Sequence, residues 1–517
     1  MDKYTLPVCS TVYSDRTEKA KVTDVSLPEY YPNIVKIIKT DGVVSSLYTD
    51  QRDNAVTLSG TANIRVTYVS DQNGYIKTAS FPLDFEHTFD ARFVRDENAL
   101  YVYEPYAYVL AASSKPKGPR SIEIKSNIAL GVTVCDDRDT ELLSEDGAQD
   151  VELHPNTVRT AKRLRLPTAS ENLHDDITLE SGMPAASEIA DSYAMLRLDD
   201  IKTENGALVY NGTAAVKCTY RAENGDPSAE AEYVYLTKDV PIGGEVVDER
   251  VEEGMAAVGR LVLTDIECGC SFDPYGESRI INVNIGCDFV GEVFSESETE
   301  YFDDGYCPSY ECDFKHSTYN CERIAGKIAE TAYISEKLHS DRSSLVQISD
   351  TYMQLNVGGA EVADGVLFVN GKASVWISGL DERGEPDCLN TSFNLHIPLE
   401  GVRDVSPDKK YVVSADLSSC DASIQNGEIV IEAEADIRGV ALEKFRIDAI
   451  SSADVNYESP KEKCKSEYII YYPDRNESLW DIAKKYEMPE DDIKSANGLK
   501  PESETTGDKK TVIIPCR

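Results

Sequence analysis

The chain has 517 residues, more than one hydrophobic core organises, so three or four domains are expected. Hydrophobic residues make up 41% of it, which is enough to build folded cores and excludes a long disordered chain. Lysine and arginine number 52 against 92 acidic residues, a net charge of −40, which argues against nucleic acids and anionic membrane surfaces as partners.

The N-terminal segment carries no secretory signal. It lacks an apolar run behind a basic start, and no window of the chain approaches the roughly 18 apolar residues of a membrane span. We therefore expect no transmembrane segment and a cytoplasmic location in the cell that makes the protein. The 13 cysteines agree with this expectation, because secreted disulfide scaffolds are usually short and carry even, closely spaced sets.

A strand-like pattern with a central glycine occurs three times. Its residues alternate between apolar and polar, and a glycine inside such a pattern usually marks a bulge or a close backbone approach. A second apolar strand pattern that ends in glycine follows at a similar distance in each copy. The first pattern covers Val56–Tyr68, Leu208–Tyr220 and Leu367–Gly379, with glycines at Gly60, Gly212 and Gly371, and the second covers Ile122–Gly131, Ile280–Gly291 and Ile429–Gly439.

Turn-forming residues separate the strands within each copy, at 70–74, 222–226 and 381–384. Each copy is therefore predicted to be a meander of antiparallel strands with one buried face. We expect a helical turn before each meander, near 27–38, 184–189 and 344–348. Polar stretches near 141–165, 295–311 and 451–466 are interpreted as linkers.

The C-terminal segment predicts a β-α-α-β order. A strand at Tyr468–Tyr472 precedes a helix capped by Ser478, and a second helix ends before Gly498. A last strand covers Thr511–Pro515. The fold class is thus mainly β, with three repeated antiparallel β modules followed by a small α+β module. The expected ranges are 15–145, 155–298 and 318–455 for the β modules and 466–517 for the last one.

The C-terminal pattern resembles the LysM domain. In that family a sugar groove lies between the loop from strand 1 to helix 1 and the loop from helix 2 to strand 2. The family commonly has Gly-Asp before its Ser/Thr-Leu pair, where this chain has Asn476-Glu477. The matching residues are Tyr468, Ile470, Ser478, Leu479, Trp480, Ile482, Ala483, Tyr486, Ile493, Asn497, Leu499, Ile513, Ile514 and Pro515.

The repeats resemble the SPOCS modules of endospore-forming bacteria, through Leu27-Pro28, Pro32, Ile34, Ile37 and the glycine-anchored strands. A row of such modules that ends in LysM is similar to the SipL family of spore-morphogenesis proteins. The resemblance implies a protein that acts in the mother cell at the forespore surface and helps to attach the spore coat. It also implies that the LysM end contacts a coat morphogenetic ATPase.

Binding is expected at the rim of the LysM-like module. Trp480 lies beside the apolar stripe of its helix, so we predict that it is an exposed binding anchor, with core packing as the alternative. The candidate residues for partner or glycan binding are Asn476, Glu477, Ser478, Trp480, Asn497, Gly498, Leu499 and Lys500.

Other motifs are interpreted as structural. Cys307, Cys312, His316 and Cys321 have the residue types of a zinc site, but their spacing is loose and they fall in an expected linker. Cys268-Gly-Cys270 fits a packed strand, and Gly371-Lys372 lacks the glycine-rich run of a phosphate-binding loop. No histidine lies in a nucleophile or metalloprotease motif. We assign no catalytic residue, no metal and no cofactor.

These observations favour a non-enzymatic scaffold that binds a coat morphogenetic ATPase and other coat proteins, in the mother cell or retained in the spore coat. The alternative is a protein that binds peptidoglycan or a chitin-like glycan through LysM. An enzyme is the third hypothesis, and no group of residues supports it.

Overall fold

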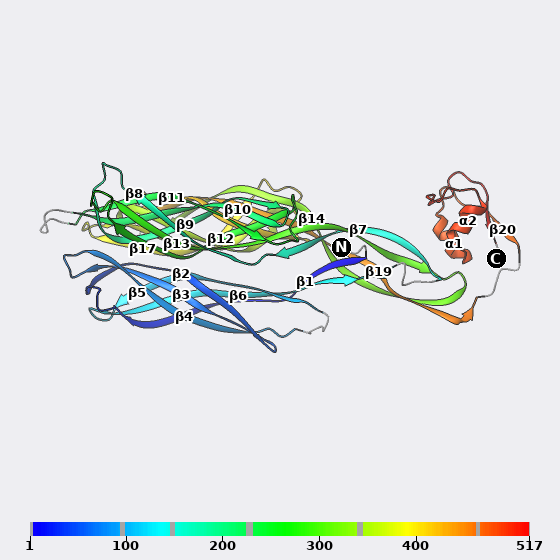
Figure 1. Cartoon of the computed structure of the whole chain (residues 1–517), viewed down its shortest axis with the longest axis horizontal. Helices are drawn as coiled ribbons and strands as arrows, with labels where there is room; N and C mark the ends of the chain where they lie inside the picture. The colour runs from blue at the N-terminus through cyan, green and yellow to red at the C-terminus, as the bar shows by residue number, and fades with distance from the viewer. Residues whose placement is uncertain are drawn as a thin grey trace.

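A computed structural model describes residues 4–93, 99–144, 150–223, 231–338, 345–461 and 466–515. It contains three β modules in an elongated body and a small helical module at the far end of a stalk (Figure 1). In the part of the chain that is described, neither helix has the length and apolar character needed to cross a membrane. The mainly β fold class predicted from the sequence is confirmed.

Each β module is a sandwich of two antiparallel sheets with its own hydrophobic core. In one sheet the last strand lies in the middle and pairs with both the first and the fifth strand. The other sheet is the predicted meander of the second, third and fourth strands. Module 1 consists of β1 (Thr5–Ser26), β2 (Ile34–Arg52), β3 (Ala55–Ser70), β4 (Ile76–Asp90), β5 (Tyr101–Pro116) and β6 (Ser121–Glu141).

Modules 2 and 3 repeat this topology. In module 2 the first strand is split at Pro167, which has no backbone N–H to donate, so both β7 and β8 pair with β13. Module 2 contains β7 (Glu152–Arg165), β8 (Ala169–Thr178), β9 (Ala186–Glu204), β10 (Ala207–Ala222), β11 (Tyr233–Val247), β12 (Ala256–Ser271) and β13 (Ile280–Tyr306). Module 3 contains β14 (Tyr310–Leu338), β15 (Leu345–Ala363), β16 (Val366–Asp381), β17 (Pro386–Leu399), β18 (Lys409–Gln425) and β19 (Glu428–Pro460).

The central glycines of the three repeated strand patterns, called the anchor glycines below, lie where two strands come unusually close. A Cβ atom on each would fall 2.1–2.6 Å from a backbone carbonyl oxygen of the neighbouring strand, closer than any side chain tolerates. A register shift, the sign of a β-bulge, occurs beside each of them. The prediction of a close approach or bulge is therefore confirmed. The glycines and the residues that carry the carbonyls are Gly60 with Ser46, Gly212 with Arg197 and Gly371 with Asn356.

The predicted helical turns are wrong. Residues 34–38 belong to β2, 186–189 to β9 and 345–348 to β15, where their backbones pair with the third strand of the same module. The predicted polar turns at 70–74 and 381–384 do join strands, with Gly74 and Gly384 at positive φ. The third predicted turn, at 222–226, lies partly outside the described residues.

The linker interpretation is also wrong for most of the polar stretches. The first and last strands of each module continue past the sandwich as a two-stranded ribbon, so residues 152–165, 295–306 and 451–460 are paired. These ribbons lie together in the stalk (Figure 1). A small core that includes Leu6, Leu142, Cys321 and Ile447 joins them. Strands cross the expected module boundaries at 155, 298 and 318, and the range of each module as a separate domain stays a prediction.

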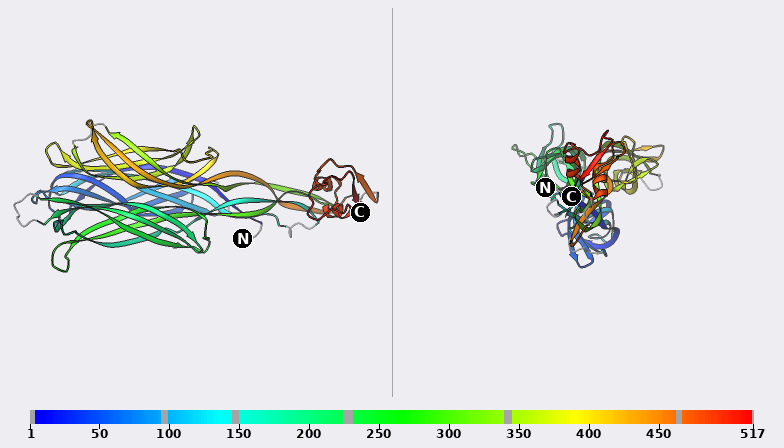
Figure 2. Two further views of the ribbon diagram at one scale, coloured as in Figure 1. Left: turned by 90° about the horizontal axis from the view of Figure 1, so that it is seen from above. Right: turned by 90° about the vertical axis from the view of Figure 1, so that its right-hand side faces the viewer.

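The three sandwiches lie around a common axis, which Figure 2 shows as three lobes in the end view. The residue five positions after each anchor glycine donates a hydrogen bond to a backbone carbonyl on the second strand of another module. The donors therefore link module 1 to module 2, module 2 to module 3 and module 3 to module 1. The pairs are Arg65 with Ser192, Lys217 with Thr351 (3.0 Å) and Trp376 with Thr40 (2.9 Å).

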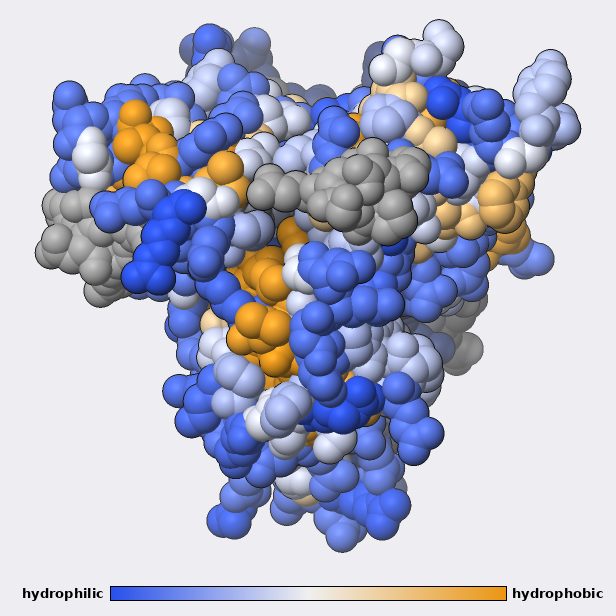
Figure 3. Space-filling model, turned by 90° about the vertical axis from the view of Figure 1, so that its left-hand side faces the viewer, coloured by the Kyte–Doolittle hydropathy of each residue, from blue (hydrophilic) through white to orange (hydrophobic). Residues whose placement is uncertain are grey.

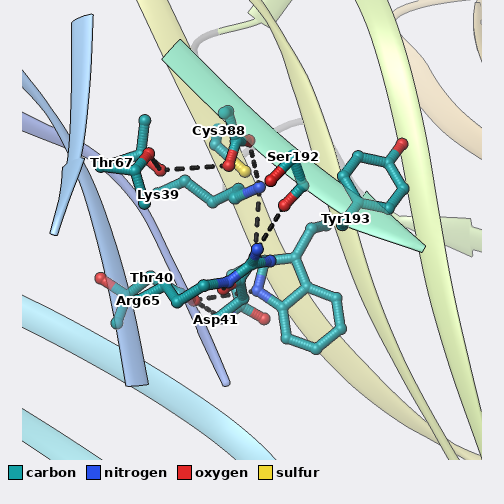
Figure 4. A network of polar contacts seen from close by, with 12 residues as sticks. Lys39, Thr40, Asp41, Arg65, Thr67, Ser192, Tyr193 and Cys388 are labelled. Atoms are coloured by element: carbon teal, nitrogen blue, oxygen red, sulfur yellow. Dashed lines mark hydrogen bonds and ion pairs between the residues drawn. The ribbon is translucent and has the colours of Figure 1, made fainter. Parts of the chain in front are cut away.

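Buried charges surround this ring of donors (Figure 4). Asp41 accepts two hydrogen bonds of 2.9 Å from Arg65, and the Lys39 ammonium lies 3.1 Å from the same carboxylate. Asp191 of module 2 also pairs with Lys39. Burial alone would raise the pKa of Asp41, but Arg65 and Lys39 hold it below its ordinary value. The ring is therefore a charged junction that ties the modules into one body.

The end of the body away from the C-terminal module is mostly hydrophilic, as the net charge leads one to expect (Figure 3). Apolar side chains gather between its lobes. Exposed apolar residues at the strand ends there come from all three modules and include Val35, Phe272 and Val346.

Candidate functional site at the tip of the stalk

The C-terminal module has the predicted β-α-α-β order. It comprises β20 (Tyr468–Tyr471), α1 (Leu479–Tyr486), α2 (Glu490–Ala496) and β21 (Val512–Pro515), with β20 and β21 paired antiparallel. The Ser478 side chain accepts a hydrogen bond from the Asp481 amide, so the predicted cap of α1 is confirmed. Gly498 has a φ of 58° just after α2, the left-handed conformation expected at a helix end.

Two loops of this module lie side by side. The loop between β20 and α1, residues 472–478, and the loop between α2 and β21, residues 497–511, are joined by two backbone hydrogen bonds, and Leu479 at the start of α1 adds a third. Because both ends of each loop are fixed by the core, the loop backbones have little freedom to lose when a ligand binds. The donor and acceptor pairs are Asn476 with Gly507, Thr506 with Glu477 and Leu479 with Glu504.

The predicted binding residues fall into different structural roles. Asn476, Gly498 and Lys500 are exposed on the two loops. The other predicted loop residues hold the module together. Glu477 bonds to Tyr471 and the Asp474 amide, Ser478 caps α1, Leu499 packs on the core, and the Asn497 side-chain amide pairs with the backbone of Ile493 and Ile513.

The predicted exposure of Trp480 is wrong. The helix does turn Trp480 to the edge of the module, but that edge rests on the end of the stalk and leaves the side chain only 8% exposed. The Trp480 indole nitrogen donates to Asp304 at 3.1 Å, and its ring lies 5.0 Å from those of Tyr306 and His154. Sequence periodicity describes only the helix itself and cannot show what covers its outer edge.

Further contacts hold the module on this seat, by which we mean Asp304, Tyr306 and His154. The Lys484 ammonium lies 2.6 Å from an Asp304 oxygen, and the Tyr306 hydroxyl donates to the Met488 carbonyl at 2.8 Å. Burial would raise the pKa of Asp304, but hydrogen bonds from Lys484 and Trp480 hold it below its ordinary value. The seat therefore fixes which side of the module faces outward.

The cysteines near the seat do not assemble a four-ligand site. Cys307 and Cys312 form a disulfide across the turn between β13 and β14, which the cysteine pattern did not predict. His316 is exposed on β14, and Cys321 is buried in the stalk core. Within the described residues, no group of three or more potential ligands is arranged to hold a metal ion.

Sequence patterns did not reveal the buried ring of Arg65, Lys217 and Trp376. The available signal was positional, because all three stand five residues after an anchor glycine and all three carry strong N–H donors. Their different chemistry hid the shared role. The donors of the ring are engaged in contacts within and between the modules, so the ring is a structural site and leaves the two loops of the C-terminal module as the candidate binding site.

Comparison with known proteins identifies one region. Residues 475–503 match the LysM domain model. No curated protein and no solved structure matches the chain, so the resemblance of the β modules to SPOCS modules stays a prediction. LysM is a general carbohydrate- and peptidoglycan-binding type of module. The chain thus carries a LysM domain, seated at the end of a stalk that three β-sandwich modules build.

Proposed function

We propose that this is a non-enzymatic binding protein whose LysM domain binds an N-acetyl-sugar polymer such as peptidoglycan through the 472–478 and 497–511 loops. The observation that carries the proposal is the orientation of the LysM domain. The seat covers the Trp480 edge, whereas Asn476, Gly498 and Lys500 stay exposed on the loop side. The body and stalk then act as a spacer that presents this side outward.

The loop side suits a polar ligand of extended shape. Its exposed residues offer amide, ammonium, hydroxyl and backbone groups, which are the partners that sugar hydroxyl and acetamido groups need. The hydrogen bonds between the loops keep the backbone groups in place before binding, which lowers the entropic cost of capturing a flexible polymer.

The test is co-sedimentation of the full chain with insoluble peptidoglycan and, separately, with chitin. Thr505 is exposed on the second loop, so Thr505→Trp should obstruct the loop side and reduce retention by about tenfold. Ile470→Trp is the matched control, because Ile470 is exposed on β20 outside both loops. Failure of the unaltered chain to sediment with either polymer, or equal retention of the two variants, would contradict the proposal.

A second candidate is a scaffold of endospore formation that binds a coat morphogenetic ATPase and other coat proteins at the forespore surface. The observation that favours it is the group of exposed apolar residues from all three modules at the end of the body away from LysM. Affinity capture from sporulating cells tests it, with the full chain compared with a chain that ends at Lys465. Loss of the ATPase on truncation would assign that contact to LysM, and capture of no coat protein by either chain would contradict this candidate.

A further inference from the structure

Two cysteine thiols meet at the point where module 1 joins the stalk. Cys9 on β1 lies opposite Asp137, and Cys135 on β6 lies opposite Thr11, so the two cysteines are diagonal neighbours on one face of the ladder. The interaction between their thiols raises the pKa of Cys9 and lowers that of Cys135. Cys135 is buried and Cys9 is half-buried, so solvent reaches the pair through Cys9.

Charged groups from all three modules face this pair. Lys410 of β18 is near Cys9, and Arg165 of β7 is near Cys135, while the carboxylates of Asp137 and Glu104 oppose them. The Thr11 hydroxyl lies 3.8 Å from the Cys135 sulfur. The interaction with Cys9 lowers the pKa of Cys135 and, together with Arg165, favours its thiolate.

We propose that Cys9 and Cys135 form a redox-active dithiol that closes to a disulfide in an oxidising environment. A separate observation supports disulfide chemistry in this chain, because the other end of the stalk holds the Cys307–Cys312 disulfide. The new bond would tie the first strand of module 1 to its last strand, at the base of the stalk. The inference is independent of what LysM binds.

The chemistry is thiol–disulfide exchange with a small-molecule disulfide as the oxidant. Cys135 takes the proton of Cys9, and the Cys9 thiolate attacks one sulfur of the oxidant, releasing one thiolate. The released thiolate takes the proton from Cys135, whose sulfur attacks the Cys9 side of the mixed disulfide and releases a second thiolate. One thiol and one thiolate of the pair thus lose two electrons in forming the disulfide bond, and the oxidant becomes one thiol and one thiolate.

Another cysteine pair provides an internal comparison. The interaction between Cys218 on β10 and Cys268 on β12 also raises the pKa of the first thiol and lowers that of the second, but Cys218 lies in the core of module 2. An oxidant must enter that core to react. We therefore expect the Cys9–Cys135 pair to oxidise about tenfold faster than the Cys218–Cys268 pair in the folded chain.

The experiment treats the reduced full chain with oxidised glutathione and maps peptides by mass spectrometry without reduction. The expected product is a Cys9–Cys135 cross-linked peptide pair that has lost two hydrogens. Cys9→Ser should abolish it, and Cys287→Ser, a change at a buried core thiol, should not. Circular dichroism confirms that each variant is folded. Stable glutathione adducts on Cys9 without the cross-link, or no reaction of Cys9 in the folded chain, would overturn the proposal.

Discussion

The ring between the modules and the seat beneath LysM are built from the same parts, in different surroundings. In each, an indole N–H and a lysine ammonium donate hydrogen bonds to oxygen atoms of another segment. Beside the ring, the Lys39 and Asp41 side chains are 4% and 3% exposed, whereas Lys484 of LysM and its seat partner Asp304 are 44% and 36% exposed. Loss of a partner is costly where the charges are buried and cheap where water replaces it. The buried charges therefore help to unite the body, whereas the ion pair at the seat contributes little to holding LysM in place.

The largest expected effect comes from removing the buried carboxylate of the ring. Asp41→Asn should lower the free energy of unfolding of the body by about 3–5 kcal/mol, because Lys39 and Arg65 lose the charge that compensates their burial. The midpoint of urea unfolding at neutral pH measures it. Asp50→Asn on the same strand is the matched control, since its partner Arg52 is exposed and the expected change is below about 0.5 kcal/mol. Similar losses for the two variants would show that burial does not distinguish these charges.

A second junction in the body predicts a pH dependence. Arg438 of module 3 donates to the Leu198 and Asp199 carbonyls of module 2 and lies 3.4 Å from Asp416. Burial raises the pKa of Asp416 to about 7, against the opposing effect of Arg438. At a pH above the ordinary pKa of an aspartate, the folded chain therefore keeps a proton on Asp416 that the unfolded chain has released. The stability that this proton contributes is complete below the ordinary aspartate pKa and is lost as pH rises towards 7.

The variant Asp416→Asn measures this contribution. The free energy of unfolding of the natural chain, relative to the variant, should fall by about 2–3 kcal/mol between pH 5 and pH 8, since the asparagine does not titrate. Urea unfolding at the two pH values gives the difference. Arg260 and Asp436 face the same carboxylate, and both are unchanged in the variant. A difference that is constant or grows with pH would contradict the raised pKa.

The smallest expected effect concerns the seat. Asp304→Asn should weaken the docking of LysM by only about 0.5–1 kcal/mol, because its ion pair with Lys484 is open to solvent. The chain has two tryptophans, Trp376 in the ring and Trp480 against the seat. One NMR spectrum of isotope-labelled tryptophan therefore reports on both contacts. We expect hydrogen exchange at the Trp480 indole to rise by roughly two- to fivefold, with no change at Trp376. Equal acceleration at both would mean that the seat and the ring are not separate units.

The sequence predicted features that depend on local pattern. Gly60, Gly212 and Gly371 marked a close strand approach because only glycine leaves room for a neighbouring carbonyl. The cap at Ser478 and the apolar stripe of α1 were readable within one helix. The β-rich fold and the LysM domain followed from such patterns.

Features that depend on distant partners were not predictable in this way. Residues 451–460 looked like a linker because their pairing partners on β14 lie more than 100 positions earlier in the chain. The burial of Trp480 depends on Asp304 and Tyr306, which its own helix cannot reveal. Polar composition in these places reflects ribbons that are paired along their edges but solvated on their faces.

The antiparallel ribbons of the stalk also determine how the molecule resists tension. LysM follows the end of β19, which pairs with β14 along the stalk and with β18 inside the body. A pull on LysM against a fixed body acts along the strands, whereas the hydrogen bonds between antiparallel strands run perpendicular to them. The load is therefore shared by many hydrogen bonds that are loaded in shear. These bonds do not break one after another, as they would if the two strands were pulled apart from one end. A LysM domain anchored to a wall would transmit force into the body through the strongest direction of its sheets.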